Sequence, residues 1–174
     1  VQVAGLSTGG FVAVWQSYEQ DGSNWGIYGQ RFDSSGNAIG SEFQVNTYTT
    51  GGQTRATITA LDNGAFLVAW DSDNQEGKHY EVYGQLYDAS GGKIGSEFKL
   101  NSLDSNKQAF PSIAKIDNGN FVSVWTSYGQ SGGHDDDIHA QIYQANGTKV
   151  GNEFRVNTNT SQEQSYPSVI GLSN

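Results

Sequence analysis

The sequence contains no cysteine and no methionine, and only two prolines among its 174 residues. The missing cysteine excludes a disulfide framework, a thiolate zinc site, an iron–sulfur cluster and a cysteine nucleophile. Without an initiator methionine, we expect a processed chain or one cut from a longer protein. Apolar residues make up 35% of the chain and aromatic residues 12%, which is core-forming material and too much for a disordered polymer. The length fits one domain.

Basic residues are also scarce. Nine Lys and Arg stand against 18 Asp and Glu, which gives a formal net charge of −9, and the basic residues lie far apart. A nucleic-acid surface needs clustered basic residues to displace counterions, so nucleic acid is excluded as a partner. The same charge disfavours an anionic membrane surface. No apolar run approaches the roughly 18–20 residues of a spanning helix, and membrane insertion is not expected.

What the sequence does have is a threefold repeat. Trp15, Trp70 and Trp125 are 55 residues apart, and each closes an apolar run that begins at phenylalanine. A Tyr-Gly-Gln type block, a Gly-Ser-Glu-Phe type block and a further apolar block recur with the same spacing. A repeat of this length identifies one supersecondary unit per period. The chain therefore reads as a single repeat array, 1–174, with approximate units 1–50, 51–105 and 106–161, and 162–174 as the first strand of a further unit.

Each repeated block has the character of a β-strand. The blocks are rich in Val, Ile, Phe, Tyr and Trp and are separated by Gly, Asn, Asp and Ser clusters. Asp62-Asn63-Gly64 predicts a tight hairpin, because Asn and Gly tolerate positive φ, and Asp33-Ser34-Ser35-Gly36 predicts a second one. Four strands in about 55 residues are typical of a propeller blade. We predict an all-β fold, a β-propeller-type array of four-stranded antiparallel blades with about three repeats.

The same residues carry a family resemblance. The segments 11–17, 28–33, 40–47 and 166–169 resemble the tandem repeats of about 55 residues in large secreted bacterial proteins of the RTX or hemolysin type, which are adhesin-like. The resemblance covers essentially the whole chain and implies a secreted or cell-surface location and propeller-like blades. It implies no catalytic residues. The calcium-binding nonapeptide of such proteins, Gly-Gly-x-Gly-x-Asp, is absent, so calcium binding is not implied by it.

Acidic and aromatic residues gather on one predicted face. In an antiparallel meander the tight hairpins lie at one end, and the long loops after each Trp strand lie at the other together with the inter-unit loops. Carboxylates beside aromatic rings suit carbohydrate or calcium recognition, and the bland alternative is a solvated acidic loop face. The candidate ligand-binding residues on this face are Tyr18, Asp21, Trp25, Asp71, Asp73, Tyr80, Tyr128 and Asp136. Trp25 is expected in a loop, where it suits a sugar platform better than the packed Trp15, Trp70 and Trp125.

One stretch begins like a calcium loop. Asp71, Asp73 and Glu76 could offer oxygen ligands to a hard cation, so calcium is left open as a cofactor. The match to an EF-hand is poor, because Glu76 stands where the turn glycine belongs and Val82 where the bidentate glutamate belongs. Two sequons start at Asn146 and Asn159 and would be glycosylation sites if the source glycosylates.

Recurring polar residues favour structure over chemistry. Gln30, Gln85 and Gln141 repeat, as do Asn46, Asn101 and Asn157, and Glu42, Glu97 and Glu153. Such recurrence could mark three ligand sites, but it more often marks a side chain that satisfies backbone groups in every blade. No nucleophile-elbow motif is present, and no carboxylate pair stands out from the repeat. An enzyme is not expected.

The function expected from this pattern is structural. Propellers close with four to eight blades, so three units leave flat apolar end faces. We expect an extracellular structural or adhesive repeat module that assembles into a longer array, fibre or surface layer, by self-association or through adjacent repeats of a longer chain. The alternative is a lectin-like or calcium-dependent binding module that binds glycans with the long-loop face.

Overall fold

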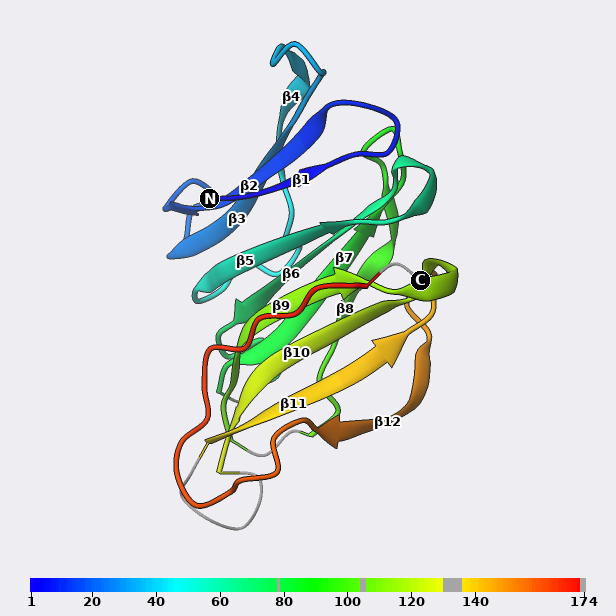
Figure 1. The fold of residues 1–174 in the computed structure, drawn as a ribbon. Helices are drawn as coiled ribbons and strands as arrows, with labels where there is room; N and C mark the ends of the chain where they lie inside the picture. Colours follow the sequence, from blue (N-terminus) through cyan, green and yellow to red (C-terminus); the bar gives the residue numbers. More distant parts are fainter. Residues whose placement is uncertain (78, 104–105, 130–135, 173–174) are drawn as a thin grey trace.

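The structure is a computed structural model that describes residues 1–77, 79–103, 106–129 and 136–172. These residues form three four-stranded antiparallel sheets, in which each strand pairs with the next along the chain (Figure 1). The first sheet holds β1 (Gln2–Gly5), β2 (Phe11–Tyr18), β3 (Trp25–Phe32) and β4 (Ala38–Gln44); the second holds β5 (Gln53–Ala60), β6 (Phe66–Ser72), β7 (Glu81–Tyr87) and β8 (Lys93–Lys99); the third holds β9 (Gln108–Lys115), β10 (Phe121–Tyr128), β11 (Asp136–Tyr143) and β12 (Lys149–Arg155). We call them blades A, B and C.

The predicted hairpin chemistry is present in the backbone. In η1 (Asp62–Gly64), Asn63 and Gly64 have φ of 58° and 79°, and the amide of Ala65 donates to the carbonyl of Asp62. This is a left-handed two-residue turn of the kind that Asn-Gly favours. The segment η2 (Asp117–Gly119) repeats it between β9 and β10. The sequence therefore sets the same turn between the first two strands of blades B and C.

The hairpin between the third and fourth strands is held by a side chain. The carboxylate of Asp33 accepts the backbone amides of Ser35 and Asn37, both at 2.8 Å, and Gly36 has φ of 83°. Asp88 does the same in blade B, and Asn146 accepts the Thr148 amide at 3.0 Å in blade C. These aspartates cap turns, as local hydrogen bonding by Asp predicts.

The core lies between blades, not within one sheet. Blade A contributes Val12, Val14, Ile27 and Val45 to the first cluster, and blade B answers with Ile58, Phe66, Val68, Trp70, Tyr83 and Tyr87. Blade B presents its opposite face, including Leu67, Val82 and Leu100, to Ile113, Phe121, Trp125 and Tyr143 of blade C. β6 is buried along its whole length, as its two-sided apolar pattern predicts. The blades therefore stack face to face, and the fold is a β-propeller-type array.

The C-terminal segment 164–172 runs beside blade C without joining its sheet (Figure 1). Its Tyr166 amide donates to Thr126 Oγ1 at 3.1 Å, and its Val169 amide donates to Ser112 Oγ at 3.2 Å. The predicted further strand over 162–174 is not formed in the described part, up to 172, because these amides contact side chains on the face of blade C and not a strand edge. No helix in the described ranges is long and apolar enough to cross a membrane.

Candidate functional site

The recurring asparagines and glutamines hold the blades together. Asn46, Asn101 and Asn157 each accept a backbone amide from the third strand of their blade, at 2.7–2.9 Å. Gln85 donates to the carbonyls of Leu86, Ile94 and Gly95 at 3.0–3.3 Å, and Gln30 and Gln141 make the equivalent bonds. The register shifts beside each glutamine, so the side chain satisfies carbonyls that the irregular ladder leaves unpaired.

Replacing Gln85 by methionine is expected to lower the free energy of unfolding by about 1–2 kcal/mol, because three buried or half-buried carbonyls lose their donor. Gln30→Met in blade A removes the same bonds at a half-buried position and is expected to cost less. Chemical denaturation of both variants measures the difference. Equal losses would show that burial of the glutamine does not matter.

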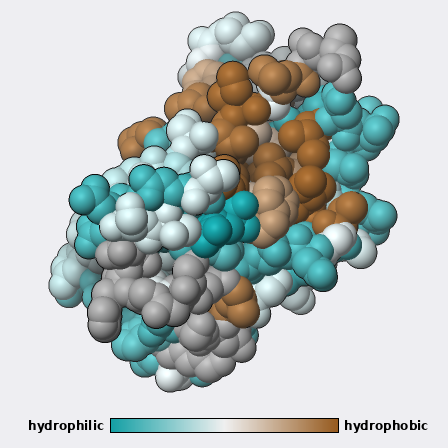
Figure 2. Space-filling view, turned by 60° about the horizontal axis from the view of Figure 1, so that its bottom comes forward, coloured by the Kyte–Doolittle hydropathy of each residue, from teal (hydrophilic) through white to brown (hydrophobic). Residues whose placement is uncertain are grey.

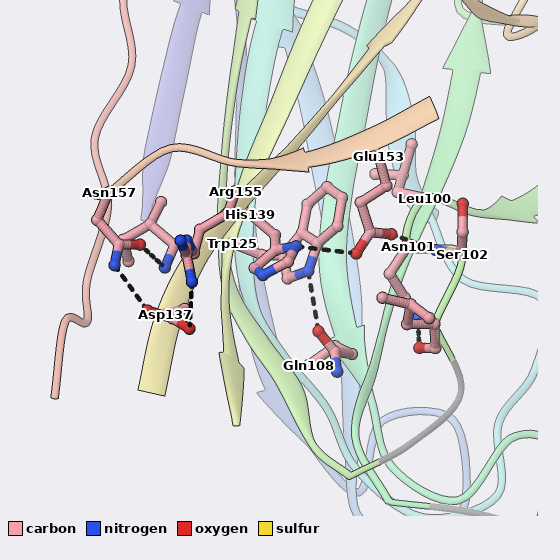
Figure 3. Close-up of polar contacts among 12 residues, drawn as sticks. Leu100, Asn101, Ser102, Gln108, Trp125, Asp137, His139, Glu153, Arg155 and Asn157 are labelled. Atoms are coloured by element: carbon pink, nitrogen blue, oxygen red, sulfur yellow. Dashed lines mark hydrogen bonds and ion pairs between the residues drawn. The ribbon is translucent and has the colours of Figure 1, made fainter. Parts of the chain in front are cut away.

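The recurring glutamates latch neighbouring blades. Glu97 of blade B accepts the amides of Thr47 and Tyr48 that follow blade A, at 2.6 and 3.2 Å. Glu153 of blade C accepts the Ser102 amide at 2.7 Å, and its other oxygen lies 3.2 Å from Nδ1 of the buried His139 (Figure 3). Glu42 of blade A accepts from Gln20 within its own blade. A glutamate at this position therefore fixes the loop of the preceding blade wherever such a blade is present.

A second recurring device lies where the first strand of each blade begins. Arg55, Phe110 and Tyr166 occupy equivalent positions, and their φ values are 54°, 58° and 58°. Left-handed backbone is unusual for large side chains. Their amides donate to side chains of the preceding blade, which are Gln16 Oε1 for Arg55, Asp71 Oδ1 for Phe110 and Thr126 Oγ1 for Tyr166, each at 3.1 Å. The residue after each repeated tryptophan is thus an acceptor for the next blade.

This device explains the position of Asp71. The side chain is fully buried and also pairs with the Nε of Arg55. Burial raises the pKa of Asp71 to about 7, although the Arg55 guanidinium and the Phe110 amide act in the opposite direction. The ion pair alone would lower this pKa, so desolvation is the larger effect. Asp71 is accordingly not an exposed ligand residue of a loop, as the sequence suggested.

Aromatic and cationic side chains converge around Asp71. The Arg55 guanidinium lies over the rings of Phe110 and Tyr80, with Cζ 4.5 and 5.3 Å from their centroids. The Lys107 ammonium lies 4.8–5.6 Å from the rings of Tyr80, Tyr128 and Phe110. Asp136 is the cross-strand neighbour of Tyr128 and contributes to the raised pKa of that tyrosine, after burial. Four predicted ligand-binding residues, Asp71, Tyr80, Tyr128 and Asp136, therefore belong to one cluster.

Three other predicted residues form a separate group on blade A. Tyr18 and Trp25 contact edge to face at 5.1 Å between centroids. Trp25 is the first residue of β3 and half-buried, so it does not lie in a loop as expected. Asp21 accepts the Ser23 amide at 3.1 Å and Gln44 Nε2 at 3.3 Å, which closes its own loop. This group is a small aromatic surface whose carboxylate is already engaged.

The proposed calcium ligands are held apart by different partners. Asp71 pairs with Arg55, and Glu76 pairs with Lys99 at 2.8 Å while it accepts the Tyr83 hydroxyl at 3.2 Å. The Asp73 amide donates to the carbonyl of Gly52 at 2.9 Å. Across the described ranges, no group of three or more His, Cys, Asp or Glu side chains could hold a metal ion. Calcium binding stays a prediction, and both ion pairs would have to break for it.

The two sequon asparagines are exposed but locally bonded. Asn146 accepts the Thr148 amide in the β11–β12 hairpin, and Asn159 accepts the Ser161 amide and hydroxyl at 3.0 and 2.8 Å. Their glycosylation stays a prediction.

Comparison with known proteins supports the architecture. No protein-family model and no curated protein matches this chain. A Dyadobacter fermentans protein of unknown function superposes with a TM-score of 0.59 at 11% identity, over 88% of this chain and 52% of that one. An endo-arabinase from Bacteroides thetaiotaomicron gives 0.56 at 15% identity, over 86% and 59%, and an α-L-arabinanase from Penicillium chrysogenum gives 0.60 at 13% identity, over 92% and 49%.

The likeness defines the class of fold and nothing narrower. The chain spans about half of the length of these solved structures. Identities of 11–15% show a shared fold, and fold alone does not establish activity. The chain is a β-propeller-type array of three blades.

Proposed function

We propose that this chain is an extracellular structural or adhesive repeat module, whose end blades stack with further blades of the same kind into a longer array or surface layer. One observation carries the proposal. Positions that are buried at both internal blade interfaces are exposed at the two ends of the array. The proposal assigns the chain assembly and binding instead of catalysis. Its extracellular location is supported by the resemblance of the repeats to those of secreted adhesin-like proteins.

Blade A leaves one of the two end faces open. Val3 in β1 is 58% exposed, whereas its equivalents Ile58 and Ile113 are 9% and 6% exposed. Trp15 is half-buried, whereas Trp70 and Trp125 are fully buried against the preceding blade. The face therefore retains the apolar surface that blades B and C bury.

Blade C leaves the complementary face open. Val156 is 51% exposed, whereas its equivalents Val45 and Leu100 are fully buried. Phe154 is 46% exposed, and its equivalents Phe43 and Phe98 contact Tyr87 and Tyr143 of the next blade at 5.5 and 6.2 Å between ring centroids. Figure 2 brings this side of the molecule forward and shows hydrophobic surface in a continuous strip flanked by hydrophilic residues.

The two faces suit each other because they repeat the internal interface. The face of blade C corresponds to the face that blade B offers to blade C, and the face of blade A corresponds to the surface that receives it. Polar contacts extend the match: Glu42 stands where Glu97 and Glu153 accept amides of the preceding blade. We propose that Glu42 accepts the amides of a preceding blade in the same way, and that a second copy of this chain supplies that blade.

Phe154→Lys is expected to abolish concentration-dependent association of the isolated chain, because it places an ammonium in the apolar face that a second copy would cover. The parent chain is expected to form dimers and longer head-to-tail species as its concentration rises. Sedimentation velocity over a hundredfold concentration range measures both.

Ile94→Lys is the matched control. Ile94 is 45% exposed on β8 of the middle blade, so the substitution adds the same charge at nearly the same exposure, away from the end faces. It is expected to leave association unchanged. A parent chain that stays monomeric throughout, or association that Ile94→Lys weakens as much as Phe154→Lys, would contradict the proposal.

A further inference from the structure

The left-handed positions at the start of the first strands carry an unusual set of side chains. Arg55, Phe110 and Tyr166 all have φ between 54° and 58°, where glycine fits without strain. The bulge needs only the backbone amide, which each residue donates to the preceding blade. A glycine would provide that amide at lower conformational cost. The large side chains at these positions therefore point to a use beyond the fold, since strained non-glycine residues cluster at binding sites.

These side chains contact one another in a row across the blades. The Arg55 guanidinium lies over the Phe110 ring at 4.5 Å, and the Phe110 ring contacts the Tyr166 ring at 4.4 Å between centroids. Tyr166 is 70% exposed, so its ring is open to a ligand. We call the row Arg55, Phe110 and Tyr166 the inner ladder. It joins blade B, blade C and the C-terminal segment into one surface.

The inner ladder lines a groove of about 390 Å³. The opposite part of its lining is polar: Thr57, Ser112 and Ser168 occupy equivalent positions two residues after each ladder residue. Ser112 Oγ accepts the Val169 amide at 3.2 Å and keeps its proton to donate. The volume is within the range of small-molecule sites. Apolar rings on one side and hydroxyl groups on the other match the C–H faces and hydroxyls of a sugar.

The ladder also concentrates positive charge on an acidic protein. Arg55 and Lys107 are two of only nine basic residues, and both lie over the Phe110 ring. Arg55 Nε pairs with Asp71, its Nη2 has no hydrogen-bond partner, and its side chain is 34% exposed. Because burial raises the pKa of Asp71 to about 7, that carboxylate offsets the Arg55 charge only in part near neutral pH. An anionic group on the ligand would complete the pairing.

We propose that the groove along the inner ladder binds a saccharide that carries carboxylate groups, with its ring stacked on Tyr166 and its carboxylate held by Arg55 and Lys107. A neutral saccharide would leave the two cations unused. A nucleic acid would need many more basic residues than this chain has. The proposal concerns a site of its own and does not depend on the end-to-end assembly described above.

Binding of oligogalacturonides, measured by calorimetry on the intact chain, tests the site. Neutral galacto-oligosaccharides of equal length serve as the comparison ligand, and inorganic sulfate tests for simple anion binding. We expect the oligogalacturonides to bind at least tenfold more tightly than the neutral oligomers, and sulfate not to compete at equal concentration. Tyr166→Gly is expected to weaken binding at least tenfold, and Lys107→Gln to weaken it severalfold.

Tyr166→Gly separates binding from folding, because glycine suits the left-handed backbone and the melting temperature is expected to stay within a few degrees of the parent. Tyr18→Ala removes another exposed tyrosine, on blade A and outside the groove, and is expected to leave binding unchanged. The proposal is overturned if oligogalacturonides do not bind, if neutral oligomers bind equally well, or if sulfate displaces the ligand at equal concentration. Equal weakening by Tyr18→Ala and Tyr166→Gly would overturn it too.

Discussion

Replacing Trp125 by alanine is expected to lower the free energy of unfolding by about 3–5 kcal/mol, the range measured for large buried aromatic residues. Trp125 is fully buried in the interface between blades B and C, and its Nε1 donates to Gln108 Oε1 at 2.9 Å (Figure 3). The substitution leaves a cavity that spans two sheets and removes a buried hydrogen bond. Because the core lies between the blades, one residue of this kind supports the packing of both.

Trp15→Ala is the matched comparison, since Trp15 has the same place in blade A but lacks a preceding blade and is only half-buried. A loss of about 1–2 kcal/mol is expected for it, in proportion to the smaller area removed from the core. Equilibrium unfolding in urea, at a concentration below association, gives both values. A loss for Trp15→Ala as large as that for Trp125→Ala would show that the stability of the array does not come from the blade interfaces.

The contrast between these tryptophans shows what periodicity can and cannot predict. Spacing of Trp15, Trp70 and Trp125 predicts equivalent strands in equivalent blades, and the three antiparallel sheets confirm the predicted fold. The turn residues fix the hairpins locally, so Asn63 and Gly64 could be placed from sequence alone. Whether a given tryptophan is covered depends on the neighbouring blade, which is a long-range property that local pattern does not contain.

The residues of the inner ladder illustrate a different gap. Arg55, Phe110 and Tyr166 share no chemical type, and none is the Gly or Asn that usually marks left-handed backbone, so local rules expect ordinary extended residues there. A signal was present in their equal spacing, one residue before Ala56, Pro111 and Pro167. Their proximity, however, depends on how blades stack, and so does the contact of Lys107 with rings from three strands and loops.

Asp71 was misjudged for a physical reason. A carboxylate just after a strand, followed by Ser72 and Asp73, has the pattern of an exposed oxygen-rich loop. The structure buries it because the left-handed amide of Phe110 in the next blade needs an acceptor, a role filled by Gln16 and Thr126 at the equivalent positions. That recurrence was hidden because the three acceptors differ chemically.

The buried carboxylate leads to a pH dependence that the substitution Asp71→Asn is expected to remove. Burial raises the pKa of Asp71 from 3.8 to about 7 in the folded protein, so between about pH 4 and 7 the folded state binds the proton more strongly than the unfolded state. Stability therefore falls as pH rises through this window, and the contribution is fully present only below the unfolded pKa. A gap of about three pH units corresponds to roughly 4 kcal/mol as an upper value.

Denaturant unfolding of the parent and Asp71→Asn at pH 4.5, 6 and 8 measures this contribution as the change in their difference. The free energy of unfolding of the parent is expected to fall by roughly 2–4 kcal/mol relative to the variant between the two extremes. Asparagine keeps an acceptor for the Phe110 amide, as Gln16 does for Arg55, so the comparison isolates the charge. Asp73→Asn, two residues along and half-buried, is expected to follow the pH dependence of the parent.

The sign of the result decides between the two forces that act on this carboxylate. If attraction to Arg55 outweighs desolvation, Asp71 stays ionised in the folded state and the parent gains stability relative to the variant as pH rises above about 4. If desolvation wins, as its complete burial indicates, the parent loses stability toward pH 8 and the Arg55 charge is only partly neutralised near pH 7. A constant difference between the two proteins across all three pH values would contradict both accounts of the pair.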